Sequence, residues 1–319
     1  MAEAVGRLRQ DVGDRLRWRV PPTARMRLLE VRERSRLWTA DLRTLPDLLV
    51  IGAQRSGTSS LYRYLRMHPN VAGPLRKEVD YFGFRFDRGE HWYRANFPLM
   101  ARRELAQRLG RPFLTFEATP DYLLHPLAAG RAGALVPDAR IVVLLRDPVD
   151  RAVSHFRHAV RHGWETLPFQ DALAAEPDRL DGEMAHIHEN PGYRASALRR
   201  YSYVTRGLYA EQIARWLEVF PRGQLLAIDA TQLYEDPAGA LHTVLDFVGL
   251  PRWQPAEFRN YSYRTADVHK GSSTSGVGES LDDLRRHFRP ANAELERLLG
   301  QSFSWSSVPG TARLDPGEG

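Results

Sequence analysis

Four short apolar runs, rich in Leu, Ile and Val, are separated by longer segments with helical periodicity. The apolar runs are Asp47–Ile51, Phe113–Phe116, Ile141–Leu145 and Leu225–Ile228. The helical segments are 58–67, 149–161, 208–220 and 237–248. Strands that are apolar throughout and alternate with helices are typical of parallel sheets that are covered on both faces. The sequence therefore predicts an α/β fold with a central parallel β-sheet flanked by helices.

The composition excludes several kinds of chemistry. None of the 319 residues is Cys, which rules out disulfides, zinc sites built from thiolates and cysteine nucleophiles. No apolar run approaches the ~18 residues of a membrane-spanning helix. The first residues also lack the apolar stretch of a secretory signal. We therefore expect a cytoplasmic protein.

The positive charge is concentrated at the N-terminus. Residues 1–43 contain eleven Arg and six acidic residues, whereas the chain as a whole has a net charge of +6. We predict a basic N-terminal arm or helix over 1–43, a main domain over 44–305 and a flexible tail over 306–319. A basic arm on a nearly neutral body fits a membrane-surface or partner contact as well as a nucleic acid, and we expect no nucleic-acid partner. A weak membrane-surface contact is one interpretation, and a helix over 24–38 that packs on the domain with its Arg face in solvent is the simpler one.

The first apolar run ends in a loop bounded by two glycines and followed by a helix. Gly52 and Gly57 are five positions apart, as in a nucleotide P-loop, but Thr58 stands where that motif requires Lys. The loop instead offers Arg55 and the hydroxyls of Ser56, Thr58 and Ser59. Backbone N–H groups and a helix N-terminus in this arrangement bind a phosphate. The missing Lys disfavours an ATP-dependent phosphotransferase and favours a phosphosulfate, although a plain Gly/Ser turn is the alternative.

A second cationic loop follows the third apolar run. Arg146 lies at the end of the predicted strand, where open α/β sheets bind ligands, and Pro148 is suited to the first turn of a helix. Ser154 falls two turns later on a helix face that can approach Arg146. A guanidinium and a hydroxyl together can hold a second phosphate. Arg146 and Asp147 could instead form a local ion pair.

The two loops together resemble a known family. GAQRSGTSSL (52–61) and LLRDPVDRAVSHF (144–156) are similar to the two cofactor-binding motifs of sulfotransferases that use 3′-phosphoadenosine 5′-phosphosulfate (PAPS). Residues 77–82 (KEVDYF) and 117–122 (EATPDY) resemble blocks of the heparan-sulfate-type sulfotransferase domain. The resemblance covers about residues 47–300. It implies the P-loop-like sulfotransferase fold.

The resemblance also implies roles for individual residues. The 5′-phosphosulfate would be held by Arg55, Ser56, Gly57, Thr58 and Ser59. The 3′-phosphate would be held by Arg146 and Ser154, and the remaining nucleotide contacts would come from Tyr209, Lys270 and Gly271. Glu78 corresponds to the general base of the family, with Lys77 and Arg55 as further catalytic residues. PAPS would be the donor and 3′-phosphoadenosine 5′-phosphate (PAP) the product, with no metal required.

Several positions leave the roles of the Lys-Glu block and the acceptor open. Glu78 could pair with Lys77, although neighbouring residues on a helix do not face each other and separate roles are therefore favoured. Heparan-acting members usually have Lys at the position of Arg55, His at that of Asp80 and Arg at that of Ser272. These differences suggest a relative that does not act on heparan chains.

The sequence thus predicts transfer of a sulfuryl group from PAPS to a hydroxyl or amine of a carbohydrate, glycolipid or natural product. A P-loop phosphotransferase and a non-catalytic nucleotide-binding module are the alternatives. The stripe of His155, His158 and His162 is more simply explained as a helix face than as a metal site. Most aromatic residues between Tyr81 and Tyr93 are expected in the core. Arg accounts for 43 of 45 basic residues, which suggests a bacterial source.

Overall fold

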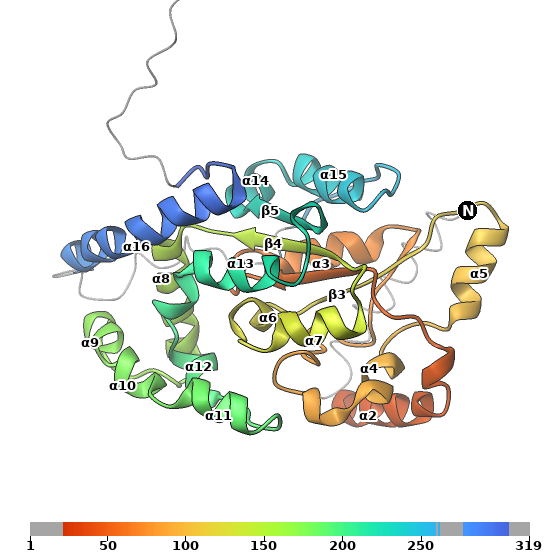
Figure 1. The fold of residues 1–319 in the computed structure, drawn as a ribbon, viewed down its shortest axis with the longest axis horizontal. Helices are drawn as coiled ribbons and strands as arrows, with labels where there is room; N and C mark the ends of the chain where they lie inside the picture. Colours follow the sequence, from red (N-terminus) through yellow and green to blue (C-terminus); the bar gives the residue numbers. More distant parts are fainter. Residues whose placement is uncertain (1–21, 260, 262–276, 306–319) are drawn as a thin grey trace, which may run out of the picture.

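One sheet of five parallel strands forms the centre of the molecule (Figure 1). The computed structural model describes residues 22–259, 261 and 277–305. The strands are β1 Leu48–Gly52, β2 Val71–Ala72, β3 Leu114–Ala118, β4 Arg140–Leu145 and β5 Leu225–Asp229. Their order in the sheet is β2-β3-β1-β4-β5, and all four neighbouring pairs are parallel. The predicted α/β fold with a central parallel sheet is confirmed.

The central strands are buried on both faces, because successive side chains of a strand point to opposite sides. Leu49 and Ile51 belong to one apolar cluster, and Leu48 and Val50 belong to another. The first cluster is covered by α6 Asp121–Leu124, α7 Ala128–Leu135, α13 Tyr209–Leu217 and α16 Val277–Leu299. The second is covered by α3 Thr58–Met67, α14 Ala230–Glu235 and α15 Pro237–Phe247. Helices therefore flank both faces of the sheet.

The carboxyl ends of the parallel strands meet at one edge of the sheet. The loop of residues 53–57 connects β1 to α3 there, and β4 leads directly into α8 Pro148–Arg161. In Figure 1 this edge is the side on which α8 lies. Both loops that the sequence singled out are consequently brought to the same end of the fold.

Short helices connect these elements. The segment 169–193 contains α9 Phe169–Ala174, α10 Glu176–Leu180 and α11 Glu183–Glu189. The remaining short helices are α4 Glu90–Ala95, α5 Met100–Arg108 and α12 Ser196–Tyr201. Four 3₁₀ turns cover Ala40–Leu42, Phe86–Arg88, Thr205–Gly207 and Arg222–Gln224. The aromatic residues of the segment 81–93 are buried as expected, apart from the partly buried Phe86.

Two differences from the sequence prediction concern strands. The edge strand β2 was not predicted, since two residues carry no periodicity; it pairs with Leu114 and Thr115 of β3. The strand β3 continues through Glu117, beyond the predicted end at Phe116. Apolar patterning placed the end of the strand before this charged residue, whereas Glu117 is fully buried.

The N-terminal helix α2 Pro22–Leu37 packs against α4. Its Glu33 pairs with Arg76, and its Arg36 donates to the carbonyl oxygen of Phe97. These contacts join α2 to the domain, while Arg27, Arg32 and Arg34 of the same helix are exposed. None of the helices in the described residues is long and apolar enough to cross a membrane.

Candidate functional site

The loop after β1 has the geometry of an anion-binding loop. Gly57 has a φ of 92° and precedes α3, which begins at Thr58 without a side-chain cap. The positive φ favours glycine at this position, and a Cβ atom there would lie 2.9 Å from Cδ2 of Leu233, which would have to shift. The first N–H groups of a helix have no partner within the helix. At α3 they are available to an anion.

One hydroxyl of this loop is buried without a partner. The Ser56 side chain is fully buried, and among the described residues nothing hydrogen-bonds to its Oγ. Buried polar groups are nearly always hydrogen-bonded, and an exception calls for an explanation. Thr58 is also buried, and Ser59 is half-buried. A phosphate or sulfate at the start of α3 would give Ser56 its missing acceptor, so this loop fits a phosphosulfate nucleotide.

Arg55 connects the two cationic loops. Its Nε donates to Oγ of Ser154 at 3.1 Å, and its carbonyl oxygen accepts from Nη1 of Arg146 at 3.4 Å. Burial lowers the pKa of Arg55, and the nearby charges of Arg161 and Arg146 lower it further. Guanidinium groups that gather in this way favour a bound anion.

The second loop holds Arg146 through its backbone. Tyr209 on α13 donates its hydroxyl hydrogen to the carbonyl oxygen of Arg146 at 2.9 Å, and burial raises the pKa of Tyr209 to about 12. The guanidinium of Arg146 lies 3.3 Å from Asp150, whereas Asp147 caps α8 by accepting from the N–H of Val149 at 2.7 Å. Arg146 therefore pairs with Asp150, and not with Asp147 as the alternative interpretation of the sequence had it.

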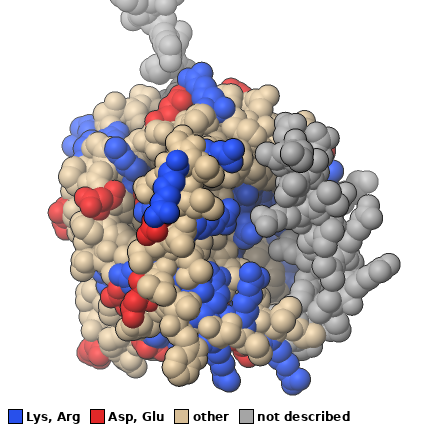
Figure 2. Space-filling view, turned by 90° about the vertical axis from the view of Figure 1, so that its right-hand side faces the viewer, with Lys and Arg blue, Asp and Glu red and all other residues tan. Residues whose placement is uncertain are grey.

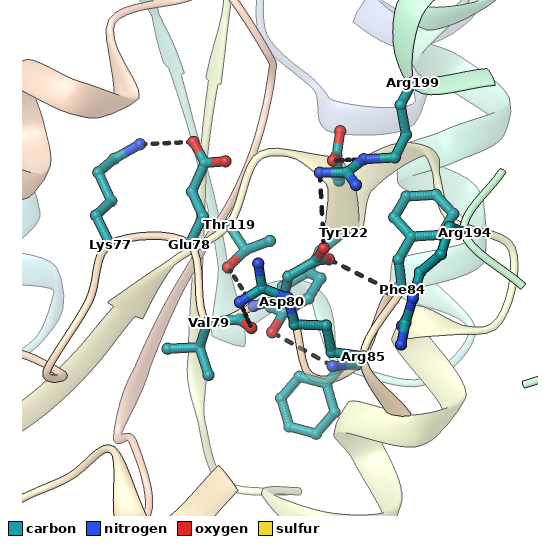
Figure 3. Close-up of polar contacts among 12 residues, drawn as sticks. Lys77, Glu78, Val79, Asp80, Phe84, Arg85, Thr119, Tyr122, Arg194 and Arg199 are labelled. Atoms are coloured by element: carbon teal, nitrogen blue, oxygen red, sulfur yellow. Dashed lines mark hydrogen bonds and ion pairs between the residues drawn. The ribbon is translucent and has the colours of Figure 1, made fainter. Parts of the chain in front are cut away.

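Lys77 and Glu78 lie in the loop after β2, at the same edge of the sheet as the other two loops. The expectation that their side chains face apart is wrong, because the segment is not helical. Nζ of Lys77 donates to Oε1 of Glu78 at 3.0 Å (Figure 3). The Glu78 side chain remains 46% exposed, with a backbone φ of 60°. A carboxylate that is accessible and beside a cation can meet an acceptor molecule.

A buried cluster of charges lies directly behind this loop. Asp121 accepts from Arg206 at 2.8 Å and from Arg199 at 3.1 Å, and the same Arg199 lies 3.9 Å from Asp80 (Figure 3). Burial would raise the pKa of Asp121, but the two guanidinium groups outweigh it and lower the pKa. Burial and the charge of Asp121 together raise the pKa of Asp80 to about 7. The sequence interpretation assigned no role to Asp121, Arg199 or Arg206, since their ion pairs join segments far apart in the chain.

Other predicted site residues are distributed as follows. Lys270 and Gly271, along with Ser272, lie outside the described residues. The predicted stripe of His155, His158 and His162 is divided: His155 is fully buried against Tyr203, whereas the other two rings contact each other. Within the described residues, no three His, Asp or Glu side chains form a group that could hold a metal ion.

Comparisons of this chain with family models and with solved structures point to the same family. The family model described as "Sulfotransferase domain" matches residues 45–288, more than half of the chain. The solved structure of a sulfotransferase from Alicyclobacillus acidocaldarius is 29% identical, with a TM-score of 0.59; the match covers 83% of this chain and 100% of that one.

Curated relatives extend the comparison. Heparan sulfate glucosamine 3-O-sulfotransferase 3B1 of Mus musculus is 27% identical over 288 residues, which are 83% of this chain and 66% of that protein. Bifunctional heparan sulfate N-deacetylase/N-sulfotransferase 3 of Homo sapiens is 35% identical over 286 residues, 80% of this chain and 30% of that protein. This chain thus spans about two thirds of the first relative and less than a third of the second.

Proposed function

Since this chain belongs to the sulfotransferase domain family, we propose that it transfers a sulfuryl group from PAPS to a hydroxyl or amine of an acceptor molecule. One observation carries the proposal. Arg55 contacts both Ser154 and Arg146, so the two cationic loops lie together, and the nearby hydroxyl of Ser56 has no hydrogen-bond partner among the described residues.

The donor would be held by residues of both loops. Arg55 and the start of α3, with Ser56, Gly57, Thr58 and Ser59, would bind the 5′-phosphosulfate. Arg146 and Ser154 would bind the 3′-phosphate, while Tyr209 fixes the backbone of Arg146. Lys270 and Gly271 are proposed as further nucleotide contacts on the resemblance alone. Guanidinium groups and N–H groups can balance the charge of a phosphosulfate, so no metal is required.

The chain's own residues would supply acid–base and electrostatic catalysis. When bound, the donor supplies a sulfuryl group whose bond to a phosphate oxygen breaks as the acceptor atom bonds to sulfur. Glu78 is exposed enough to accept the proton that the acceptor loses. Arg55 would stabilise the negative charge that develops on the departing phosphate oxygen. Lys77, paired with Glu78 at 3.0 Å, would hold that carboxylate in place before the acceptor arrives.

A carbohydrate is the acceptor class that the curated relatives favour, because the names of the two described above include heparan sulfate. Asp80 replaces the usual His of heparan-acting members, so we extend the proposal to glycolipids and natural products. A phosphotransferase is disfavoured, because the loop has Thr58 where the nucleotide P-loop requires Lys. A cytoplasmic location and a bacterial source remain predictions.

Replacing Arg146 with Ala should weaken PAP binding by roughly 10- to 100-fold, because a hydrogen bond to a charged group contributes about 1.5–3 kcal/mol. Calorimetric titration with PAP measures the effect. Arg140 is the matched control: it starts the strand that Arg146 follows, but at the opposite edge of the sheet, where it donates to the carbonyl oxygen of Gly223. Arg140→Ala should bind PAP as tightly as the wild type. Equal affinities of the two variants would contradict the proposed phosphate site.

A weak membrane-surface contact of the N-terminal arm is also proposed. On α2 and just after it, Leu28, Val31 and Trp38 are exposed, Trp38 by 93%. Arg27, Arg32 and Arg34 of α2 are exposed as well, and Figure 2, which views the molecule from the side of α5, shows Lys and Arg side chains on that face. Exposed apolar groups among Arg residues suit the surface of an anionic membrane.

The membrane proposal predicts that Leu28→Ala combined with Trp38→Ala will reduce sedimentation with vesicles of phosphatidylcholine and phosphatidylserine. Binding by the wild type should also fall as salt is added, since exposed charges are screened. The control is Val160→Ala, which removes an exposed apolar side chain of α8. If the double variant and the control sediment to the same extent, α2 and Trp38 do not form the membrane contact.

A further inference from the structure

The loop that carries Glu78 has an unusual backbone. Glu78 and Asp80 have φ angles of 60° and 62°, in the left-handed region that favours glycine. Val79 between them and Phe82 after them are fully buried. Non-glycine residues remain in this region only when their surroundings hold them there, and such residues are concentrated at functional sites. The contacts that fix this loop therefore determine where the Glu78 carboxylate lies.

Two hydroxyl groups accept hydrogen bonds from the backbone of this loop. Oγ1 of Thr119 accepts from the N–H of Asp80 at 3.2 Å, and the hydroxyl oxygen of Tyr122 accepts from the N–H of Phe82 at 3.3 Å. Figure 3 shows Thr119 and Tyr122 beside this segment. Thr119 directly follows β3, and Tyr122 lies on α6. The loop after β2 is thus tied to the neighbouring strand and its helix.

Both hydroxyl groups donate their hydrogen to the same carboxylate. Thr119 donates to Oε2 of Glu117 at 3.0 Å, and Tyr122 donates to Oε1 at 3.0 Å. Tyr93 on α4 donates to the same Oε1 at 2.6 Å. Glu117 is fully buried, and no ion pair of the described residues includes it. Three hydroxyl groups, and no cation, satisfy this carboxylate.

The charge of Glu117 sets the direction of these hydrogen bonds. An ionised carboxylate only accepts, so all three hydroxyl groups must point their hydrogens at Glu117, which leaves the lone pairs of Thr119 and Tyr122 for the loop. A protonated carboxyl or an amide would donate to one hydroxyl. That hydroxyl would then accept from both sides, and its own hydrogen would have no acceptor in the buried site.

We propose that Glu117 is a positioning residue that, through Thr119 and Tyr122, holds the loop presenting Glu78 to the acceptor. The inference rests on the proposed function, in which Glu78 accepts the proton. Glu117 touches neither donor nor acceptor, so its removal should change the turnover number more than the affinity for PAP.

The same arrangement makes turnover sensitive to pH. Burial raises the pKa of Glu117 to about 7, although its three hydroxyl partners lower it. The titratable groups around it are Tyr93 on α4, Tyr81 stacked on Tyr93, Tyr122 on α6 and Asp80 on the loop. The ionised form holds the loop, so turnover should fall as the pH decreases below 7. Asp80, whose pKa is also raised to about 7, needs a separate control.

The test measures the turnover of labelled PAPS by four variants: Glu117→Gln, Asp80→Asn, Thr119→Val and Thr119→Ser. The probe acceptors are a desulfated heparan chain and a 4-nitrophenyl glycoside. Glu117→Gln should lower kcat by roughly 10- to 100-fold, because a catalytic group displaced by about 1 Å can lose 100-fold. PAP affinity should be unchanged, and the decline of kcat below pH 7 should disappear. Asp80→Asn should retain that decline. Thr119→Val should resemble Glu117→Gln, whereas Thr119→Ser, which keeps the hydroxyl, should resemble the wild type.

Wild-type kcat and an unchanged pH profile in Glu117→Gln would overturn the inference. If that variant does not fold, equal kcat values for Thr119→Val and Thr119→Ser would overturn it instead. Failure of the proposed function looks different: Glu78→Gln would then turn over normally, or the wild type would not bind PAP. These measurements distinguish an error in the assignment of Glu78 as the base from an error in the assignment of Glu117 as its positioning residue.

Discussion

Replacing Glu78 with Gln should lower kcat by about 10²- to 10⁴-fold, the usual contribution of a general base. Gln preserves the shape of the side chain but cannot accept the acceptor's proton. The affinity for PAP should not change, because the proposed phosphate contacts come from Arg55, Arg146 and the start of α3. Turnover of labelled PAPS with the probe acceptors measures the first effect, and calorimetry with PAP measures the second.

The chain contains a closely matched control for this substitution. Glu90 is 45% exposed and pairs with Arg94 at 2.6 Å, whereas Glu78 is 46% exposed and pairs with Lys77 at 3.0 Å. Glu90→Gln removes a similar surface ion pair, but at the start of α4 instead of in the loop after β2. Its turnover should equal that of the wild type. Normal turnover by Glu78→Gln would show that another group accepts the proton.

Replacing Asp121 with Asn should lower the free energy of unfolding by about 3–5 kcal/mol, the effect of removing one partner from a buried ion pair. Arg206, whose side chain is 3% exposed, would keep its charge without a carboxylate, and Arg199 would lose its nearest anion. The two guanidinium groups lower the pKa of Asp121. Its stabilisation is therefore present above the pKa of an unfolded Asp and is lost as the pH falls through the lower folded value.

Urea denaturation measures this effect, with Asp246→Asn as the control. Asp246 lies 2.8 Å from Arg252, the same distance as Asp121 from Arg206, but both members of this pair are exposed. Surface pairs of this kind contribute little, so the control should unfold at the wild-type urea concentration. Equal midpoints for Asp121→Asn and the wild type would mean that the buried cluster does not stabilise the fold.

The sequence predicted the central strands and both cationic loops because each has a local signal. Apolar runs identify β1, β3, β4 and β5, and the spacing of Gly52 and Gly57 identifies the loop between β1 and α3. The carboxyl ends of parallel strands meet at one edge, so the two loops could be placed together without coordinates. The contact between Arg55 and Ser154 was not predicted, since the sequence placed Ser154 near Arg146.

The supports of the candidate base have no such signal. Glu78 and Asp80 adopt left-handed backbone conformations, which cannot be predicted from their residue types. This turn brings the side chain of Lys77 into contact with that of Glu78. In the sequence, Glu117 follows an apolar run and indicates only where the strand ends. Its three hydroxyl partners come from α4, α6 and the segment after β3. Contacts between distant segments depend on tertiary packing and cannot be inferred from local patterns.

Calorimetric titration of the full chain with PAP, with and without magnesium, tests the central claim most directly. The claim is that Arg55, Arg146 and the start of α3 form a phosphosulfate nucleotide site that needs no metal. We expect binding with one PAP per chain and the same affinity in both buffers. Absence of binding, or binding that requires magnesium, would contradict the assignment of these two loops to PAPS.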